Sequence, residues 1–127
     1  MDIVFAGDDS DVEDIDAVQK ELDFSTYSTV GKLSIRELAA LLSRASIYIG
    51  NDSGPLHLAA LSGVTCIGLF GPAPPVVFYP VGKITEVIHH VLECNPCDQI
   101  HCMHPEWPCI QRITVEEVKQ KVEEMLY

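Results

Sequence analysis

Hydrophobic residues along the chain fall into two kinds of stretch, short unbroken runs and segments in which they recur at helical spacing. Residues 3–7 and 65–70 are unbroken apolar runs, which are typical of buried strands in a parallel sheet. Between residues 12 and 22 the hydrophobic positions recur every three or four residues, which predicts an amphipathic helix. Strands that alternate with helices predict a doubly wound, parallel α/β sheet.

The remaining elements continue this alternation. We expect a weak strand at 25–30, a helix at 35–44, a strand at 46–50, a buried helix at 56–61, a proline-rich loop at 71–80, a strand at 86–92 and a last helix ending near 126. Two Ser/Thr-x-x-Glu sequences begin at Ser34 and Thr114, and in such a sequence the first and last side chains cap each other's backbone donors. These two sequences predict where the helix at 35–44 and the last helix begin.

Length and composition limit the kind of protein this can be. A chain of 127 residues with 47% hydrophobic and 21% charged residues is the size and composition of one globular domain. No apolar run approaches the roughly 18 residues needed to span a bilayer, and the N-terminus lacks the basic start of a secretory signal. We therefore expect a cytoplasmic protein without a transmembrane segment.

The net charge of −11 argues against nucleic acid or anionic lipid as a general partner, because both require a field of the opposite sign. Acidic residues gather at 2–23 and 116–124, where the outer faces of helices are expected. An anionic ligand must therefore be held by specific local groups.

Residues 50–57, Gly-Asn-Asp-Ser-Gly-Pro-Leu-His, stand where a predicted strand gives way to a helix. Open α/β sheets bind ligands at the carboxyl ends of their strands, and a helix N-terminus there offers unpaired N–H groups to a phosphate. Gly54 permits close approach of the backbone, and Pro55 suits the first helical position. The side chain of Asp52 or Ser53 is expected to cap the helix.

His57 lies within the first turn of this helix, so its ring is placed to donate to the same anion. The alternatives are that residues 50–57 merely start a helix and that His57 is a hydrogen-bonded core residue.

Four of the five cysteines lie close together: Cys94, Cys97, Cys102 and Cys109, with His101 and His104 between them. Four thiols are a complete tetrahedral ligand set for zinc, and a loop of reduced structural cysteines is the alternative. A redox pair at Cys94 and Cys97 ranks third, because such pairs normally open a helix and prolines keep this segment in a loop. Cys66, within a predicted buried strand, is expected to be a core residue.

Three stretches together make the sequence similar to a known family: GKLSIRELAALL at 31–42, IGNDSGPLHLA at 49–59 and GLFGP at 68–72. In this order and at these spacings they resemble glycosyltransferase family 9, which contains the ADP-heptose:lipopolysaccharide heptosyltransferases. The cysteine-rich tail and the closing ITVEEV at 113–118 resemble the family as well, so the resemblance covers essentially the whole chain.

The resemblance implies a GT-B transferase, in which two Rossmann-like domains face each other across a cleft. Residues 1–127 resemble only the C-terminal, donor-binding domain, with a cysteine-rich loop at about 94–109. The donor contacts it implies are Asp52, Ser53, Gly54 and His57, with the Ser53 and Gly54 amides on phosphate. An acidic residue after the first strand contacts the donor ribose in the family; Asp11 is the best match, and Asp8, Asp9 and Glu13 are alternatives.

The implied reaction transfers a heptose or related sugar from a nucleoside-diphosphate sugar such as ADP-heptose to a lipopolysaccharide core or other surface glycan, with no required cofactor. The family's acceptor-binding domain and its catalytic base have no counterpart in these residues. We therefore expect no catalytic residue here, no transfer by the isolated chain, and peripheral association with the inner membrane through the absent half.

One departure and one alternative limit these implications. After Phe-Gly-Pro the family usually continues Thr-Asp-Pro, whereas Ala73-Pro74-Pro75 follows here, which puts donor geometry near that loop in doubt. A non-catalytic nucleotide- or zinc-binding module is the alternative function.

Overall fold

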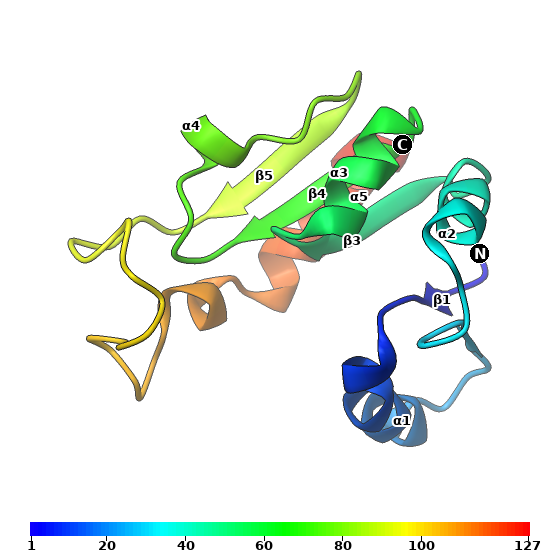
Figure 1. Cartoon of the computed structure of the whole chain (residues 1–127), viewed down its shortest axis with the longest axis horizontal. Helices are drawn as coiled ribbons and strands as arrows, with labels where there is room; N and C mark the ends of the chain where they lie inside the picture. Colours follow the sequence, from blue (N-terminus) through cyan, green and yellow to red (C-terminus); the bar gives the residue numbers. More distant parts are fainter. The chain divides into compact units, whose positions relative to one another are not determined.

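The computed structural model describes all 127 residues, which fold as two compact units, Met1–Ala40 and Leu41–Tyr127 (Figure 1). Both units are α/β, and every strand pair in them is parallel. The predicted fold class is thus confirmed, while the assignment of all residues to a single donor-binding domain stays a prediction. No helix is long and apolar enough to cross a membrane.

The first unit contains a two-stranded sheet of β1 (Val4–Phe5) and β2 (Tyr27–Ser28), joined by the 3₁₀ turn η1 (Asp9–Asp11) and the helix α1 (Val12–Glu21). Both strands are shorter than predicted, although a backbone bond from Gly31 N to Gly7 O at 3.0 Å continues the pairing beyond them. Val30 is the one buried hydrophobic residue of this unit, so its core is small.

The helix α2 (Ile35–Leu42) runs across the division between the units and ends two residues before the predicted position 44. It begins with the predicted capping box. The Ser34 N–H donates to Glu37 Oε2 at 2.8 Å, and the Glu37 N–H donates to Ser34 Oγ at 3.3 Å. Local capping chemistry therefore fixed this helix start, as the sequence predicted.

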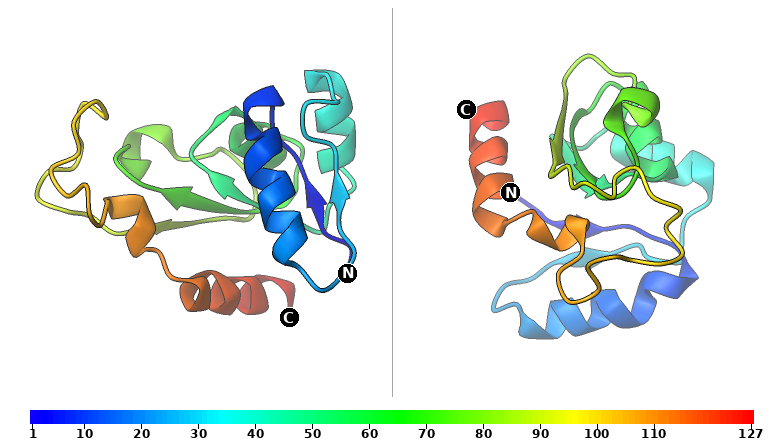
Figure 2. Two further views of the ribbon diagram at one scale, coloured as in Figure 1. Left: turned by 90° about the horizontal axis from the view of Figure 1, so that it is seen from below. Right: turned by 90° about the vertical axis from the view of Figure 1, so that its left-hand side faces the viewer.

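The second unit is built on a three-stranded sheet in the order β3-β4-β5, formed by Ile47–Asn51, Thr65–Phe70 and Thr85–His89. The helix α3 (Gly54–Leu61) lies on one face of this sheet and α5 (Val115–Leu126) on the other, as Figures 1 and 2 show. Helices on both faces of a parallel sheet are the doubly wound arrangement that the alternation of elements predicted.

The core of this unit lies between α3 and β4. Leu56, Ile67 and Phe70 are completely buried, which confirms β4 as the predicted central strand. A methyl group on Gly68 would lie 2.9 Å from Leu56 Cδ2, so the missing side chain lets α3 pack closely on the sheet. The prediction that α3 is buried on all sides is wrong: it packs on the sheet by one face only, and Leu61 is 73% exposed.

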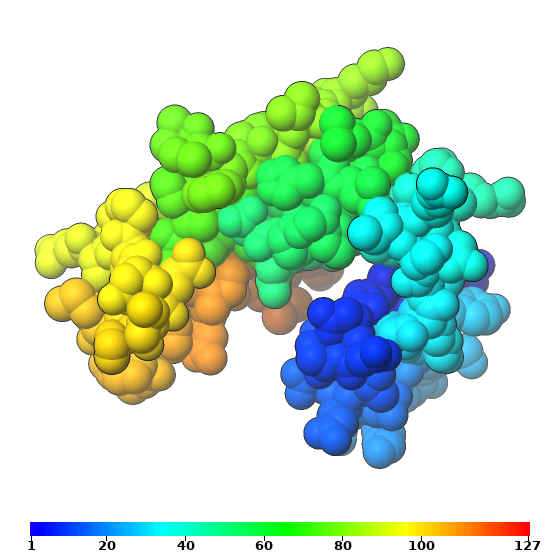
Figure 3. Space-filling model, in the orientation of Figure 1, coloured from blue at the N-terminus to red at the C-terminus, as the bar shows by residue number.

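The chain between β4 and α5 is mostly irregular. The predicted loop at 71–80 contains one short helix, α4 (Pro75–Phe78), because Pro74 has the extended backbone of a residue before a helix and proline is suited to the first helical position at Pro75. β5 ends at His89 rather than at 92, and the next regular element is the 3₁₀ turn η2 (Cys109–Arg112). We call residues 92–110 the cysteine segment; it gathers into a lobe of its own, yellow to orange in Figure 3.

The last helix begins as predicted. The Thr114 N–H donates to Glu117 Oε2 at 2.7 Å, and the Glu117 N–H donates to Thr114 Oγ1 at 3.2 Å. The predicted exposure of the acidic stretches also holds for residues 2–23, where no acidic side chain is buried.

Candidate functional site

The strand-to-helix junction predicted at residues 50–57 is formed by the carboxyl end of β3 and the start of α3. β3 ends at Asn51, and α3 begins at Gly54 with Pro55 in its first turn. Ser53 is the residue before the helix, but its hydroxyl donates back to the Asn51 carbonyl oxygen at 3.2 Å and makes no cap. The predicted side-chain cap by Asp52 or Ser53 is therefore wrong, since the Ser53 hydroxyl is engaged by the strand end and the Asp52 carboxylate faces His57.

Two backbone donors remain free at this junction. The Asp52 N–H donates to Leu69 O at 3.2 Å and the Leu56 N–H donates to Ser53 O at 3.1 Å, whereas the N–H groups of Ser53 and Gly54 have no acceptor within the chain. Both residues are exposed, and a methyl group on Gly54 would meet no atom within 4 Å. The helix N-terminus thus presents two accessible donors and an open approach, which suits an anion.

His57 stands beside these donors, paired with Asp52. Its Nε2 lies 3.6 Å from Asp52 Oδ1, and the side chains are 39% and 20% exposed. The interpretation of His57 as a buried core residue is therefore wrong. The carboxylate restrains the imidazole at the open end of α3, and the ring retains Nδ1 for another partner.

Tyr48 is a site residue that the sequence did not reveal. Its ring lies over Gly50, where a methyl group would be 2.8 Å from Cε1 and from Cζ. Its hydroxyl reaches Ser53; burial raises the pKa of Tyr48, and the hydrogen bond with Ser53 partly offsets this rise. A large aromatic residue two positions before a glycine in a strand is the signal that could have identified it, since side chains at i and i+2 share a face.

The acidic residues predicted to contact a ribose belong to the first unit, after β1. Asp11 Oδ2 accepts the Asp8 N–H at 2.9 Å, which leaves Asp11 Oδ1 without a partner on an exposed side chain. Asp8 is occupied by the hydroxyl and N–H of Ser10, and these hydrogen bonds hold the pKa of Asp8 below its ordinary value. Both Ser10 bonds go to Asp8 Oδ1, so Asp8 and Asp11 each keep one carboxylate oxygen free, and the contact of Asp11 with a ribose stays a prediction.

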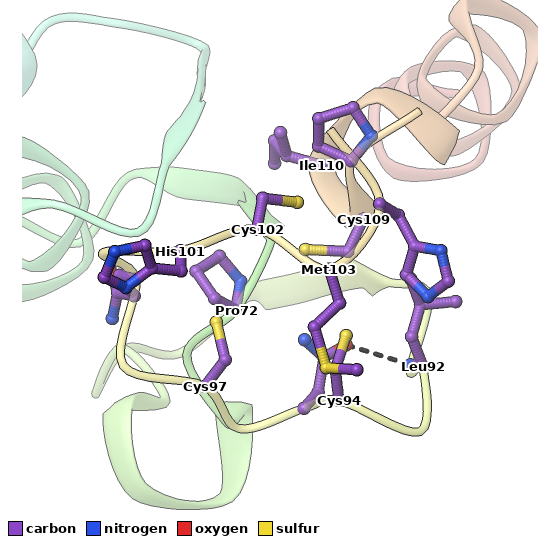
Figure 4. Close-up of a pocket in the computed structure, with 13 residues that line it drawn as sticks. Pro72, Leu92, Cys94, Cys97, His101, Cys102, Met103, Cys109 and Ile110 are labelled. Atoms are coloured by element: carbon purple, nitrogen blue, oxygen red, sulfur yellow. Dashed lines mark hydrogen bonds between the residues drawn. The ribbon is translucent and has the colours of Figure 1, made fainter. Parts of the chain in front are cut away.

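The four clustered cysteines line one cavity of about 260 Å³ in the second unit (Figure 4). His101, His104 and Met103 line it as well, and all five cysteines of the chain are free thiols. No group of three or more His, Cys, Asp or Glu side chains is arranged to hold a metal ion, so the zinc interpretation stays a prediction. Cys66 lies apart in β4, completely buried, and burial raises the pKa of its thiol, which confirms it as a core residue.

A short helix, α4, begins at the end of Ala73-Pro74-Pro75, where the sequence departs from the pattern that it resembles. Pro74 and Pro75 begin α4 directly after the Phe-Gly-Pro sequence, and α4 leaves Val76 and Val77 exposed. A turn of helix with an apolar surface therefore follows Phe-Gly-Pro in this chain.

The chain is similar in sequence to known proteins. The chain is 27% identical over 110 residues to lipooligosaccharide heptosyltransferase 2 of Campylobacter jejuni, covering 86% of this chain and 34% of that protein. It is 40% identical over 50 residues to lipopolysaccharide heptosyltransferase 3 of Escherichia coli, covering 39% of this chain and 15% of that protein. The chain thus spans about a third or less of the length of these relatives.

Solved structures resemble the fold. The glycosyltransferase family 9 protein of Veillonella parvula superimposes with a TM-score of 0.83 at 25% identity, over 98% of this chain and 36% of that one. The E. coli ADP-heptose lipopolysaccharide heptosyltransferase II gives a TM-score of 0.81 at 19% identity with the same coverage, and at this identity it supports the fold alone. Residues 1–107 match the model of glycosyltransferase family 9 (heptosyltransferase), and the chain therefore belongs to that family.

Proposed function

We propose that this chain forms the donor-binding part of a heptosyltransferase. The whole enzyme would transfer a heptose or related sugar from a nucleoside-diphosphate sugar such as ADP-heptose to a lipopolysaccharide core or another surface glycan. The observation that carries the proposal is the pair of free N–H groups at Ser53 and Gly54 beside the Asp52–His57 pair. They lie at the carboxyl end of a parallel strand, in a chain that belongs to a family of glycosyltransferases.

The donor's diphosphate would lie against the N-terminus of α3. Transfer displaces a nucleoside diphosphate from the anomeric carbon of the sugar, and negative charge develops on the departing phosphate oxygen. The Ser53 and Gly54 N–H groups and the His57 ring would donate to these oxygens and stabilise that charge, while Asp52 orients the ring. A contact between the exposed Asp11 carboxylate and a ribose hydroxyl is proposed for the first unit by itself.

A second domain would bind the acceptor and supply the group that removes the proton of the acceptor hydroxyl. General-base catalysis needs a group within hydrogen-bond reach of the acceptor hydroxyl, and we assign none among these residues. Because the chain spans about a third of the length of its relatives, we propose that transfer requires an acceptor-binding domain. That domain would also place the reaction at the cytoplasmic surface of the inner membrane.

Binding of ADP and UDP, measured by isothermal titration calorimetry, tests the donor site. We expect ADP to bind more tightly than UDP. His57→Ala should weaken ADP binding by roughly tenfold, because it removes a hydrogen bond to a charged group. Ser62→Ala is the control: it changes the opposite end of α3, where the hydroxyl donates to Leu58 O at 2.8 Å, and should leave ADP binding unchanged.

Three outcomes would contradict the proposal. Absent affinity for both ADP and UDP would remove the nucleotide-sugar assignment. Equal affinity would leave a nucleotide site without donor preference, as expected of the alternative, a non-catalytic nucleotide-binding module. Sugar transfer by the purified 127-residue chain alone would refute the requirement for a second domain.

A further inference from the structure

The cavity of the cysteine segment is a second candidate binding site, and none of the proposed donor-site residues lines it. It measures about 260 Å³ and lies within the second unit. Figure 4 shows the labelled side chains of its wall arranged around one hollow. Most of that wall is apolar or weakly polar, contributed by the four cysteines of the segment and by Pro72, Leu92, Met103, Pro108 and Ile110. A concave, mainly apolar wall is typical of a small-molecule site.

One side of the cavity is anchored to the sheet. A methyl group on Gly71 would lie 3.2 Å from Ile110 Cβ and 3.6 Å from Cys109 Sγ, so both residues pack on the backbone that follows β4. His89 Nε2 lies 2.9 Å from the Gly71 carbonyl oxygen on the same turn. The cavity is therefore formed in part by a wall that the sheet holds in place.

One polar atom of the wall residues is buried without a hydrogen-bond partner, the side-chain nitrogen of Asn95. Three such atoms occur in the chain, and Asn95 is the only one of the three residues that lines this cavity. Asn95 Oδ1 accepts the Leu92 N–H at 2.9 Å, which identifies the oxygen, so the unpartnered end of the amide is the NH₂ group. Buried donors are nearly always paired, because an unpaired one costs free energy. A ligand that brings an acceptor to Asn95 would remove that cost.

The charge of the cysteine segment favours an uncharged ligand. Residues 92–110 contain three acidic residues, Glu93, Asp98 and Glu106, and no lysine or arginine. The chain as a whole carries a net charge of −11. A carboxylate or phosphate is therefore repelled, and a neutral oxygen such as a carbonyl is the acceptor that suits Asn95.

The sulfur atoms around the cavity favour an aromatic ring. Five sulfur-containing side chains line it, Met103 and the four cysteines of the segment. Sulfur is polarizable and makes favourable contacts with aromatic rings. We propose that this cavity binds a small uncharged aromatic molecule whose carbonyl oxygen accepts a hydrogen bond from Asn95. The proposal does not rest on the donor site, because the two sites share no residue.

Two probes of matched shape test the site on the full chain under reducing conditions. Acetophenone has an aromatic ring and a carbonyl, and ethylbenzene has the same shape without an acceptor. In NMR titrations of ¹⁵N-labelled protein we expect acetophenone to bind about fivefold more tightly than ethylbenzene, as one added hydrogen bond allows. Acetophenone should also shift the side-chain amide signal of Asn95. Asn51 is the only other asparagine of the chain, so its side-chain amide is the internal control and should not shift.

Asn95→Asp tests the donor directly. A carboxylate keeps an acceptor for the Leu92 N–H and removes the NH₂ group, so the preference for acetophenone should disappear while ethylbenzene still binds. Asn51→Asp is the matched control, because it makes the same chemical change outside the cavity, and it should keep the preference.

The comparison of the two probes on the unsubstituted chain needs no variant, so it decides the matter even where Asn95→Asp does not fold. Equal affinity for the two probes would overturn the proposal, and so would binding of neither. An Asn95 signal that stays in place while acetophenone binds would place the ligand elsewhere and overturn it as well. Retention of the acetophenone preference in a folded Asn95→Asp chain would show that Asn95 is not the donor.

Discussion

At the scale of single residues, two glycines have opposite surroundings, one in the core of the second unit and one at the candidate site. Gly68 in β4 faces a full core, where a methyl group would lie 2.9 Å from Leu56 Cδ2 and 3.0 Å from Phe70 Cε2. Gly54 at the start of α3 faces open space. Neither has a positive φ, so in both cases the surroundings rather than the backbone conformation determine what a side chain would do.

This contrast predicts that two identical substitutions act on different properties. Gly68→Ala should lower the free energy of unfolding by about 1–3 kcal/mol, because Leu56 and Phe70 are fully buried and cannot move aside without strain. Gly54→Ala should leave stability nearly unchanged and weaken ADP binding, because its methyl group would occupy the proposed approach of the diphosphate. Urea unfolding and calorimetry on both variants measure the two effects; unchanged ADP affinity in Gly54→Ala would argue against a diphosphate at this position.

The sequence identified the positions of the junction but not all of its contacts. A β-rich run followed by Asp-Ser-Gly-Pro predicts a helix N-terminus at Ser53 and Gly54, and the structure places it there, although β3 has no buried residue. The sequence predicts a cap by Asp52 or Ser53 because capping is the usual role of such residues before a helix, whereas the acceptor of the Ser53 hydroxyl, Asn51 O, depends on how the turn folds back. The role of Tyr48 is not predictable for a related reason. A tyrosine in a β-rich run indicates a strand but does not show which residue its hydroxyl contacts.

At the scale of elements, α5 shows how a local motif is combined with a contact distant in sequence. Glu117 Oε2 accepts from Thr114 within the capping box, while Glu117 Oε1 lies 2.7 Å from Nε2 of His90. The box was predictable from residues 114–117 alone. The His90 contact was not, because it depends on how the chain after β5 meets the helix.

The Glu117 contacts predict how stability changes with pH. Hydrogen bonds from the Thr114 backbone and hydroxyl, and then the contact with His90, hold the pKa of Glu117 below its ordinary value of 4.5. Because the carboxyl pKa is lower in the folded state, its stabilising contribution is complete above 4.5 and is lost as pH falls through the folded-state pKa. Glu117→Gln should therefore be less stable than the unsubstituted chain at pH 7, and the difference should shrink below pH 4.5.

Thermal unfolding between pH 3 and pH 7 measures this difference. Glu116→Gln is the matched control: it removes a charge from the same helical turn, but Glu116 makes only an ion pair with Lys119 at 3.8 Å and no cap. A pH-independent difference between Glu117→Gln and the unsubstituted chain would show that the ionised carboxylate does not stabilise the helix start.

The lengths of the strands were harder to predict than their existence. The run at 3–7 gives a strand of only two residues, Val4–Phe5, which pairs with the equally short β2. The run at 65–70 is realised in full as β4, which is paired on both sides. Hydrophobic pattern thus indicates where a strand lies but not how far it extends, since β3 and β5 reach five residues each with a single neighbour.

At the scale of the whole molecule, the acidic charge and the proposed anionic ligand oppose each other. The net charge of −11 repels a diphosphate at a distance, and it is offset only at short range by the free N–H groups and His57. The sequence indicated this arrangement through its composition and its single strand-to-helix motif. It did not indicate the division into the units Met1–Ala40 and Leu41–Tyr127, because that depends on contacts between residues distant in the chain.

This opposition predicts an unusual salt dependence for nucleotide binding. The screening length falls from about 30 Å at 0.01 M to about 8 Å at 0.15 M ionic strength, so added salt removes the long-range repulsion but leaves the direct hydrogen bonds. The association rate constant of a fluorescent ADP analogue, measured by stopped flow, should therefore rise with salt over this range. The matching adenosine analogue carries no phosphate and should show no such rise. A rate constant that falls steeply with salt would instead mean that a local positive field at α3 outweighs the acidic surface, since sites that attract anions by long-range charge lose association rate when screened.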